Sequence, residues 1–295
     1  MTQFLQQLIN GLSLGSIFAV LALGLAMVYG TLGILNFAYG ELIAITGYTM
    51  YFATQAGLSF WLSALIGAVA AAVASILMQL LVFRPLQGTG FVTLLFASFA
   101  LSQVLQGIFR QAISPRAKGI PAPEVLSNVF EFGGLRISVL NVVTFVVAMV
   151  SLGLFALFMR TSRSGLQMRA AALDLTTTRL QGVSAGRVIL LAFALSGILA
   201  GIAGVLWISR TGTVTPTTGA TPILVAFVAV VLGGLGSTVG AVVGGFVFGI
   251  LEVFLEAYLP SGVVPFQFAF ALIAVAVVLF ARPEGLFGKA VEVKV

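Results

Sequence analysis

The stretch RTSRSGLQMRAAALDLTTTRLQGVSAGR, residues 160–187, separates two long apolar parts of the chain. It carries five arginines and Asp174, whereas its flanks are almost free of charge. A charged side chain at the centre of a membrane-spanning helix costs about 2.5–3.5 kcal/mol on insertion scales. The stretch therefore lies outside the hydrocarbon, between two parts of the chain that enter the membrane.

Apolar and small residues recur within this stretch at helical spacing. Steps of 3 and 4 residues put five of them on one narrow stripe: Leu166, Ala170, Leu173, Thr177 and Leu180. Ser164 and Gln167 match a capping box, and Gly182 suits the position just past a helix end. These signals favour a short surface helix, although a solvated loop that only supplies positive charge fits the composition equally well.

Composition sets the class of protein. Of 295 residues, 60% are hydrophobic and 7% are charged, whereas a soluble domain carries about 25% charged residues. We therefore expect an all-α polytopic membrane protein. The net charge of +6 does not indicate nucleic acid, because the basic residues lie in loops between apolar stretches. The chain has no cysteine or histidine, so we expect no catalytic site, cofactor or metal.

Nine apolar stretches cover most of the chain. They run approximately over residues 4–29, 32–56, 60–83, 91–109, 139–159, 188–208, 221–235, 239–259 and 265–281. The second and seventh are rich in glycine and polar residues, which is typical of broken or re-entrant helices. We expect one transmembrane domain over residues 1–295, with eight or nine transmembrane helices.

Charge predicts the orientation. With residues 160–187 in the cytoplasm, alternation of the spans puts nine basic residues inside and five outside. The N-terminus is then outside and the C-terminus is cytoplasmic. The four stretches on either side of the fifth start from opposite faces, and each set has a glycine-rich second member. This arrangement suits an inverted repeat.

Carboxylates inside the apolar stretches are candidate functional residues. Glu41 follows Asn36 and Gly40 in the second stretch, and Glu252 lies four residues before Glu256 in the eighth. Ionisable residues within a membrane mark pathways or relays by default. A carboxylate at a helix start can instead accept backbone N–H groups. We therefore expect Asn36, Glu41 and Glu252 to act in a translocation pathway or as structural caps.

The 34 glycines include Gly240 and Gly244, and Gly197 and Gly201, each pair four residues apart. Small residues at this spacing let helix backbones approach closely. We favour simple packing over a backbone-lined pathway or a subunit interface.

Several short motifs follow one another in a characteristic order. They are Asn36-Phe37-Ala38-Tyr39-Gly40-Glu41, Arg84-Pro85-Leu86, Arg160-Thr161 with Gly165 and Arg169-Ala170, Gly182-Val183, the 233–245 run, Gly249 with Glu252, and Arg282-Pro283-x-Gly285-Leu286. Over nearly its full length the chain resembles the permease subunits of ABC importers for branched-chain amino acids. Tyr39 replaces a common histidine of that family, and residues 175–178 replace its alanine-rich middle.

The resemblance implies that residues 160–187 form a loop that docks into an ATP-binding subunit. It implies that Arg169, Ala170, Asp174 and Gly182 lie at or beside that contact, where the small residues 170–172 enter a cleft. The implied partners are a second, homologous permease subunit, two ATP-binding subunits, an extracytoplasmic substrate-binding protein and membrane lipid. The implied location is a bacterial inner membrane.

Two functions are compatible with this sequence. The first is an ABC-importer permease for branched-chain or related amino acids, with urea or short amides as alternative substrates. The second is a stand-alone ion-coupled transporter or channel that uses Glu41 and Glu252. The central polar stretch favours the importer, because a self-contained carrier needs no cytoplasmic docking helix. A membrane scaffold explains neither the carboxylates nor the broken stretches.

Overall fold

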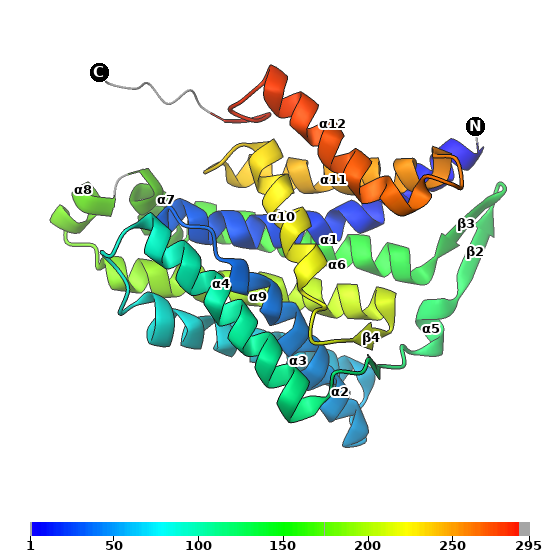
Figure 1. Ribbon diagram of the computed structural model, residues 1–295, viewed down its shortest axis with the longest axis horizontal. Coiled ribbons are helices and arrows are strands. Elements are labelled where there is room, and N and C mark those ends of the chain that lie inside the picture. Colours follow the sequence, from blue (N-terminus) through cyan, green and yellow to red (C-terminus); the bar gives the residue numbers. More distant parts are fainter. Residues whose placement is uncertain (1, 174, 289–295) are drawn as a thin grey trace.

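The computed structural model describes residues 2–173 and 175–288 and is dominated by helices (Figure 1). The helices are α1 (Thr2–Leu32), α2 (Glu41–Gln55), α3 (Phe60–Met78), α4 (Phe91–Ile108), α5 (Glu124–Ser127), α6 (Val139–Thr161), α7 (Arg163–Leu173), α8 (Leu175–Leu180), α9 (Ala185–Thr211), α10 (Ala220–Gly233), α11 (Thr238–Tyr258) and α12 (Gln267–Ala281). Shorter helical turns are η1 (Phe37–Gly40), η2 (Gln79–Phe83), η3 (Phe109–Ile113) and η4 (Val264–Phe266).

Two small antiparallel strand pairs complete the described structure. The strand β1 (Lys118–Gly119) pairs with β4 (Thr213–Val214), and β2 (Val129–Phe132) forms a hairpin with β3 (Leu135–Ser138). All four strands lie in connections between apolar helices. The prediction of an all-α polytopic membrane protein is therefore confirmed.

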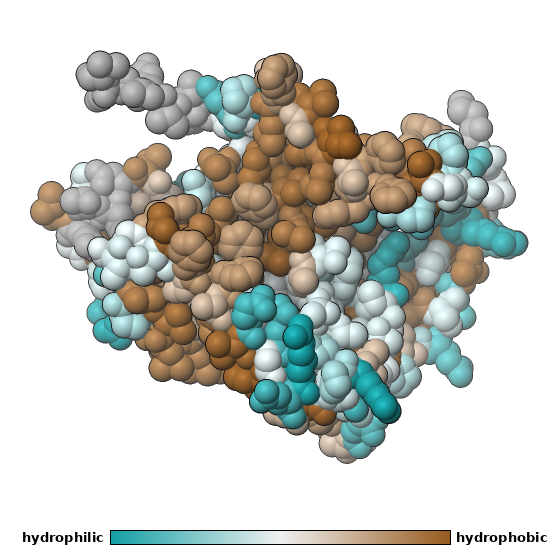
Figure 2. Space-filling model, in the orientation of Figure 1, coloured by the Kyte–Doolittle hydropathy of each residue, from teal (hydrophilic) through white to brown (hydrophobic). Residues whose placement is uncertain are grey.

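Seven helices in the described chain are long and apolar enough to cross a membrane. They span Thr2–Leu32, Phe60–Phe83, Phe91–Ile113, Val139–Thr161, Ala185–Thr211, Thr238–Tyr258 and Val264–Ala281. The two glycine-rich stretches instead form short helices, α2 with 15 residues and α10 with 14. Figure 2 shows hydrophobic side chains over α4, α10 and α12, and hydrophilic ones around the end of α4 and the β1–β4 pair.

The loops divide between two ends of the molecule. The N-terminus and the β2–β3 hairpin lie at one end, and α7 and α8 lie at the opposite end (Figure 1). This is the separation that alternating spans require. We keep the prediction, made from the charge asymmetry, that the α7–α8 end faces the cytoplasm.

The core forms around α1, which is the most deeply buried of the seven spanning helices. It packs against α6, α9, α10 and α11. Its contact with α11 is very close, because an added Cβ at Gly249 would overlap the backbone of Gly15, and one at Gly245 would overlap that of Ala19. The two predicted glycine pairs pack just as closely, Gly240 and Gly244 on the backbone of α10 and Gly197 and Gly201 on that of α3, which supports their packing role.

The packing pattern repeats within the chain. The pairs α1–α11, α10–α11 and α1–α10 are matched by α9–α3, α2–α3 and α9–α2. Exchanging α1–α4 with α9–α12 therefore preserves these contacts. The two equivalent helices α1 and α9 pack together and run in opposite directions (Figure 1). This is the arrangement of an inverted repeat.

Candidate functional site

The second stretch breaks between α1 and α2. The helix α1 ends at Leu32, Gly33 has a φ of +67°, and the chain continues through non-helical residues to η1 and then α2. Gly40 lies directly before α2, and Gly219 lies directly before α10. Their backbones touch, since a Cβ added to either glycine would overlap the carbonyl of the other. The two short helices therefore begin side by side within the core.

A polar face of α4 lies against this break. The buried residues of α4 are Leu94, Ser98, Ser102 and Gln106, which recur every four residues. The Phe37 N–H donates to Ser98 Oγ at 3.2 Å, and that hydroxyl lies 3.3 Å from the Leu35 carbonyl. Irregular backbone at membrane depth is tolerated only where such partners or a water-filled cavity surround it. The polar face of α4 supplies these partners.

Glu41 is joined to the same face of α4. Its carboxylate is 1% exposed, and Oε1 accepts hydrogen bonds from Ser102 Oγ at 2.9 Å and Gln106 Nε2 at 2.8 Å. Arg110 Nη2 contacts Gln106 Oε1 at 3.4 Å. The chain of contacts leads from the buried carboxylate to the exposed end of α4. Within the described residues, Glu41 Oε2 has no hydrogen-bond partner.

One expected role of Glu41 is a structural cap, in which its carboxylate accepts hydrogen bonds from backbone N–H groups at a helix start. The observed geometry differs from such a cap. Among the described residues, the donors to Glu41 are side chains of another helix. Glu41 nevertheless occupies the first position of α2, where the helix dipole also favours a carboxylate. The sequence analysis did not single out Ser98, Ser102 or Gln106, although polar residues at four-residue spacing in an apolar helix are a usable signal.

Asn36 and Tyr39 complete the buried part of the break. Asn36 is 2% exposed and its carbonyl accepts from the Tyr39 N–H at 3.2 Å, but its Oδ1 has no partner in the described part of the chain. The Tyr39 ring is buried, and its hydroxyl lies against Gly24 of α1. The break is thus fixed between α1, α4 and α10.

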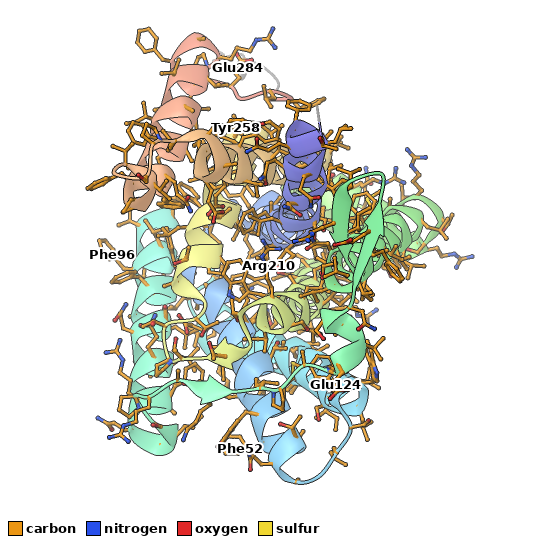
Figure 3. The ribbon with its side chains drawn as sticks, turned by 90° about the vertical axis from the view of Figure 1, so that its right-hand side faces the viewer. Phe52, Phe96, Glu124, Arg210, Tyr258 and Glu284 are labelled. Atoms are coloured by element: carbon orange, nitrogen blue, oxygen red, sulfur yellow. The ribbon has the colours of Figure 1, made fainter. Side chains whose placement is uncertain are left out.

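Glu252 belongs to a different group of polar residues from the one around Glu41. It is half-buried on α11, and the described charges that act on it are Glu256 and Arg210, the latter at the end of α9. Arg210 contacts Asn141 Oδ1 at 3.5 Å, and Asn141 donates to Asn10 Oδ1 at 3.1 Å. Figure 3 views the molecule from the end that carries the N-terminus and places Arg210 near its centre and Phe96 of α4 at its edge. The structure therefore brings Glu41 together with α4, and Glu252 with the α9 end.

The polar stretch forms two helices, α7 and α8, rather than one. Leu166, Leu173 and Leu180 are 61%, 88% and 84% exposed. Gly182 has a φ of +83°, and the Val183 N–H bonds to the Thr178 carbonyl at 3.3 Å, so the predicted helix end is confirmed. Arg169 is exposed and Ala170 is half-buried, whereas Asp174 lies outside the described residues.

Two predictions about this segment are wrong. The capping serine is Ser162, whose Oγ accepts from the Gly165 N–H at 2.8 Å, because α7 already begins at Arg163. Ser164 lies inside the helix. Ala171 is only 4% exposed and packs in the core of this chain. It therefore cannot be one of the small residues that a partner contacts.

The broken helices paired inside a polytopic bundle define a class, the membrane transport proteins with an inverted repeat. Residues 7–282 match the family model described as branched-chain amino acid transport system / permease component. The chain belongs to this family of branched-chain amino acid ABC-importer permeases.

Its relatives carry the same description. It is 34% identical to the high-affinity branched-chain amino acid transport system permease protein BraD of Pseudomonas aeruginosa, over 97% of this chain and 96% of that protein. It is 30% identical to permease protein LivH of the Escherichia coli system, with the same coverage. Permease protein LivM of Escherichia coli is 30% identical over 76% of this chain and 58% of its own length. No solved structure matches the chain significantly.

Proposed function

We propose that this chain is the permease subunit of an importer that moves branched-chain or related amino acids across a bacterial inner membrane, with ATP hydrolysed by partner subunits. The family and the names of its relatives support the substrate class. The N-terminus and the β2–β3 hairpin face outward in this proposal, and α7 and α8 face the cytoplasm. This orientation follows the excess of basic residues in the loops at the α7–α8 end.

The observation that carries the proposal is the exposed surface of α7 and α8. Three leucines lie on short helices outside the membrane-spanning bundle, with side chains 61–88% exposed. Large exposed apolar side chains clustered on a polar segment mark protein interaction sites. In our proposal they enter an ATP-binding subunit, with Arg169, Ala170, Asp174 and Gly182 at or beside the contact. A self-contained carrier has no use for this surface.

The proposed assembly holds two permease chains, two ATP-binding subunits and an extracytoplasmic binding protein. The two Escherichia coli relatives, LivH and LivM, are both named as permease proteins of a high-affinity branched-chain amino acid transport system. A second, homologous chain beside this one is therefore the natural pairing. The ATP-binding subunits drive alternating access only through contacts that differ between the two conformations.

Glu41 is proposed as a positioning residue that ties α4 to the break. Two hydrogen bonds from α4 hold its carboxylate, and these bonds connect the short helix α2 to a helix at the edge of the molecule. The rival role is an ion site in a stand-alone transporter. The unpartnered Oε2 within the described residues favours that rival.

Reconstitution separates the two functions. We expect radiolabelled leucine to enter proteoliposomes only when this chain is assembled with a second permease, the ATP-binding subunits, ATP and the binding protein. Urea and acetamide serve as alternative substrates. Uptake by the chain alone, driven by a proton or sodium gradient and lost in Glu41→Gln, would establish the rival instead.

A further inference from the structure

A cavity of about 600 Å³ lies at the α7 end of the molecule, between α1, α6, α7 and α11. Residues of α1 form its floor, among them Met27 and Gly30, and Phe155 and Ala156 of α6 form one wall. The start of α11, including Val239, forms the other wall. The volume falls within the range of small-molecule and lipid-sized sites.

The cavity lies between the last turns of α6 and the start of α11. Farther along they meet at Phe145 and Phe246, whose ring centroids are 6.5 Å apart in an edge-on contact. On the α1 side the lining combines Leu23 and Met27 with smaller residues, and a Cβ added at Gly30 would meet only Ala172, at 3.9 Å. The cavity therefore lies on the α7 side of this aromatic pair.

Two cations line the cavity, whose other described lining residues are uncharged. Arg160, at the end of α6, and Arg169, on α7, are both exposed and both contribute to its lining. The described lining residues include no carboxylate, and within the described chain neither guanidinium forms an ion pair. A largely apolar cavity with two arginines that form no ion pair with the described residues is complementary to a molecule with an acyl chain and a phosphate.

The cavity is open at the surface of the described chain. Beside it on α6, Leu154 and Leu157 are 62% and 56% exposed, and Val239 on α11 is 64% exposed. Basic pockets between membrane helices on the cytoplasmic side bind anionic lipid head groups. We propose that this cavity binds an anionic phospholipid, with one acyl chain against α1, α6 and α11 and the phosphate between Arg160 and Arg169. The proposal does not depend on the transported substrate, and it places Arg169 beside the contact with an ATP-binding subunit rather than within it.

Native mass spectrometry of the purified chain with phosphatidylglycerol and phosphatidylcholine tests this proposal. We expect the wild type to retain phosphatidylglycerol in preference to phosphatidylcholine. The double variant Arg160→Gln/Arg169→Gln should lose this preference, with phosphatidylglycerol binding about 25-fold weaker, since each arginine near the surface contributes about a factor of five. Its control is Arg84→Gln/Arg282→Gln, which removes two exposed arginines that do not line the cavity.

A second variant tests the cavity itself. Ala156→Trp places a large ring in the cavity and should abolish retention of phosphatidylglycerol while both arginines remain. Val146→Trp is the matched control, because Val146 is exposed on the same helix and does not line the cavity. Size-exclusion chromatography checks that each variant is folded.

Three results would overturn the proposal. They are equal retention of the two lipids by the wild type, retention unchanged in the arginine double variant, and retention unchanged in Ala156→Trp. If Ala156→Trp keeps the lipid but releases a protein subunit from the assembled transporter, the cavity belongs to a protein partner.

Discussion

The two short helices α2 and α10 occupy equivalent places in the repeat, yet they begin differently. Each follows a glycine, Gly40 or Gly219, and the next residue is Glu41 in α2 and Ala220 in α10. The helix α10 starts from a threonine turn, in which the Thr215 N–H donates to Thr218 Oγ1 at 2.7 Å. A short helix at this depth therefore does not require a carboxylate at its first position.

The helices that cover the two breaks differ in the same way. The buried residues of α4 include Ser98, Ser102 and Gln106, whereas the buried residues of α12 are Ala271 and Val275. The first repeat thus holds a buried polar network where the second has apolar packing. Because α10 begins without a carboxylate, the start of a short helix does not by itself explain why Glu41 is present. We infer that the polar network attaches α4 to the first repeat.

The contact between the two glycines should be the least tolerant feature of both repeats. Gly219→Val would push a side chain into the Gly40 carbonyl, and overpacking of this kind costs about 3 kcal/mol. We expect a large loss of folded protein in thermal-shift chromatography. Gly153→Val is the control, because space around Gly153 is open. Equal stability of Gly219→Val and wild type would show that the helix starts do not touch.

Removing the carboxylate should have a smaller effect. Glu41→Leu leaves the donors Ser102 and Gln106 without their acceptor, and unpaired buried polar groups cost about 2 kcal/mol. Glu41→Gln keeps an acceptor and should cost about 1 kcal/mol, with a modest fall in transport. The control Glu256→Gln, at an exposed position, should change stability by less than about 0.5 kcal/mol. Normal stability with abolished transport in Glu41→Gln would favour a pathway role.

The inverted repeat can be tested with two cysteine substitutions that should hardly change the free energy of unfolding. The loops that follow α2 and α10 contain Leu58 and Leu235, which are 39% and 48% exposed. The chain has no cysteine, so Leu58→Cys and Leu235→Cys each give one labelling site. We expect an impermeant thiol reagent to label Leu58→Cys only from outside and Leu235→Cys only from the cytoplasm. Labelling of both from one face would refute the inversion.

Much of the fold could be predicted because a local pattern, a continuous run of apolar residues, marks a membrane-spanning helix. The third apolar stretch, residues 60–83, coincides with the spanning helix Phe60–Phe83. The broken second and seventh stretches were also predicted, since glycine and polar residues within an apolar run weaken a continuous helix. Glycine packing followed from spacing alone.

The site could be predicted only in part, because its partners come from distant helices. Glu41 stands out as a carboxylate in an apolar stretch, but its donors are 61 and 65 residues away. At the start of α7, two serines compete as caps, and the close packing of Gly165 on the Met159 carbonyl favours Ser162. The burial of Ala171 depends on how α7 rests on the core. The pairing of Glu41 with α4 and the burial of Ala171 depend on contacts between distant parts of the chain, which a local pattern does not specify.

The central claim is that α7 and α8 connect this permease to its ATP-binding subunits. ATP-driven uptake by a transporter altered only on these two helices tests it most directly. The variant Leu173→Asp/Leu180→Asp changes two side chains that are 88% and 84% exposed, so the chain should remain folded, within about 0.5 kcal/mol of wild-type stability for each change. The control Val125→Asp alters a residue that is 63% exposed at the opposite end. We predict that the double variant loses ATP-binding subunits and ATP-driven leucine uptake while the control retains both. Uptake at the wild-type rate by the double variant would contradict the proposal that α7 and α8 connect this permease to its source of energy.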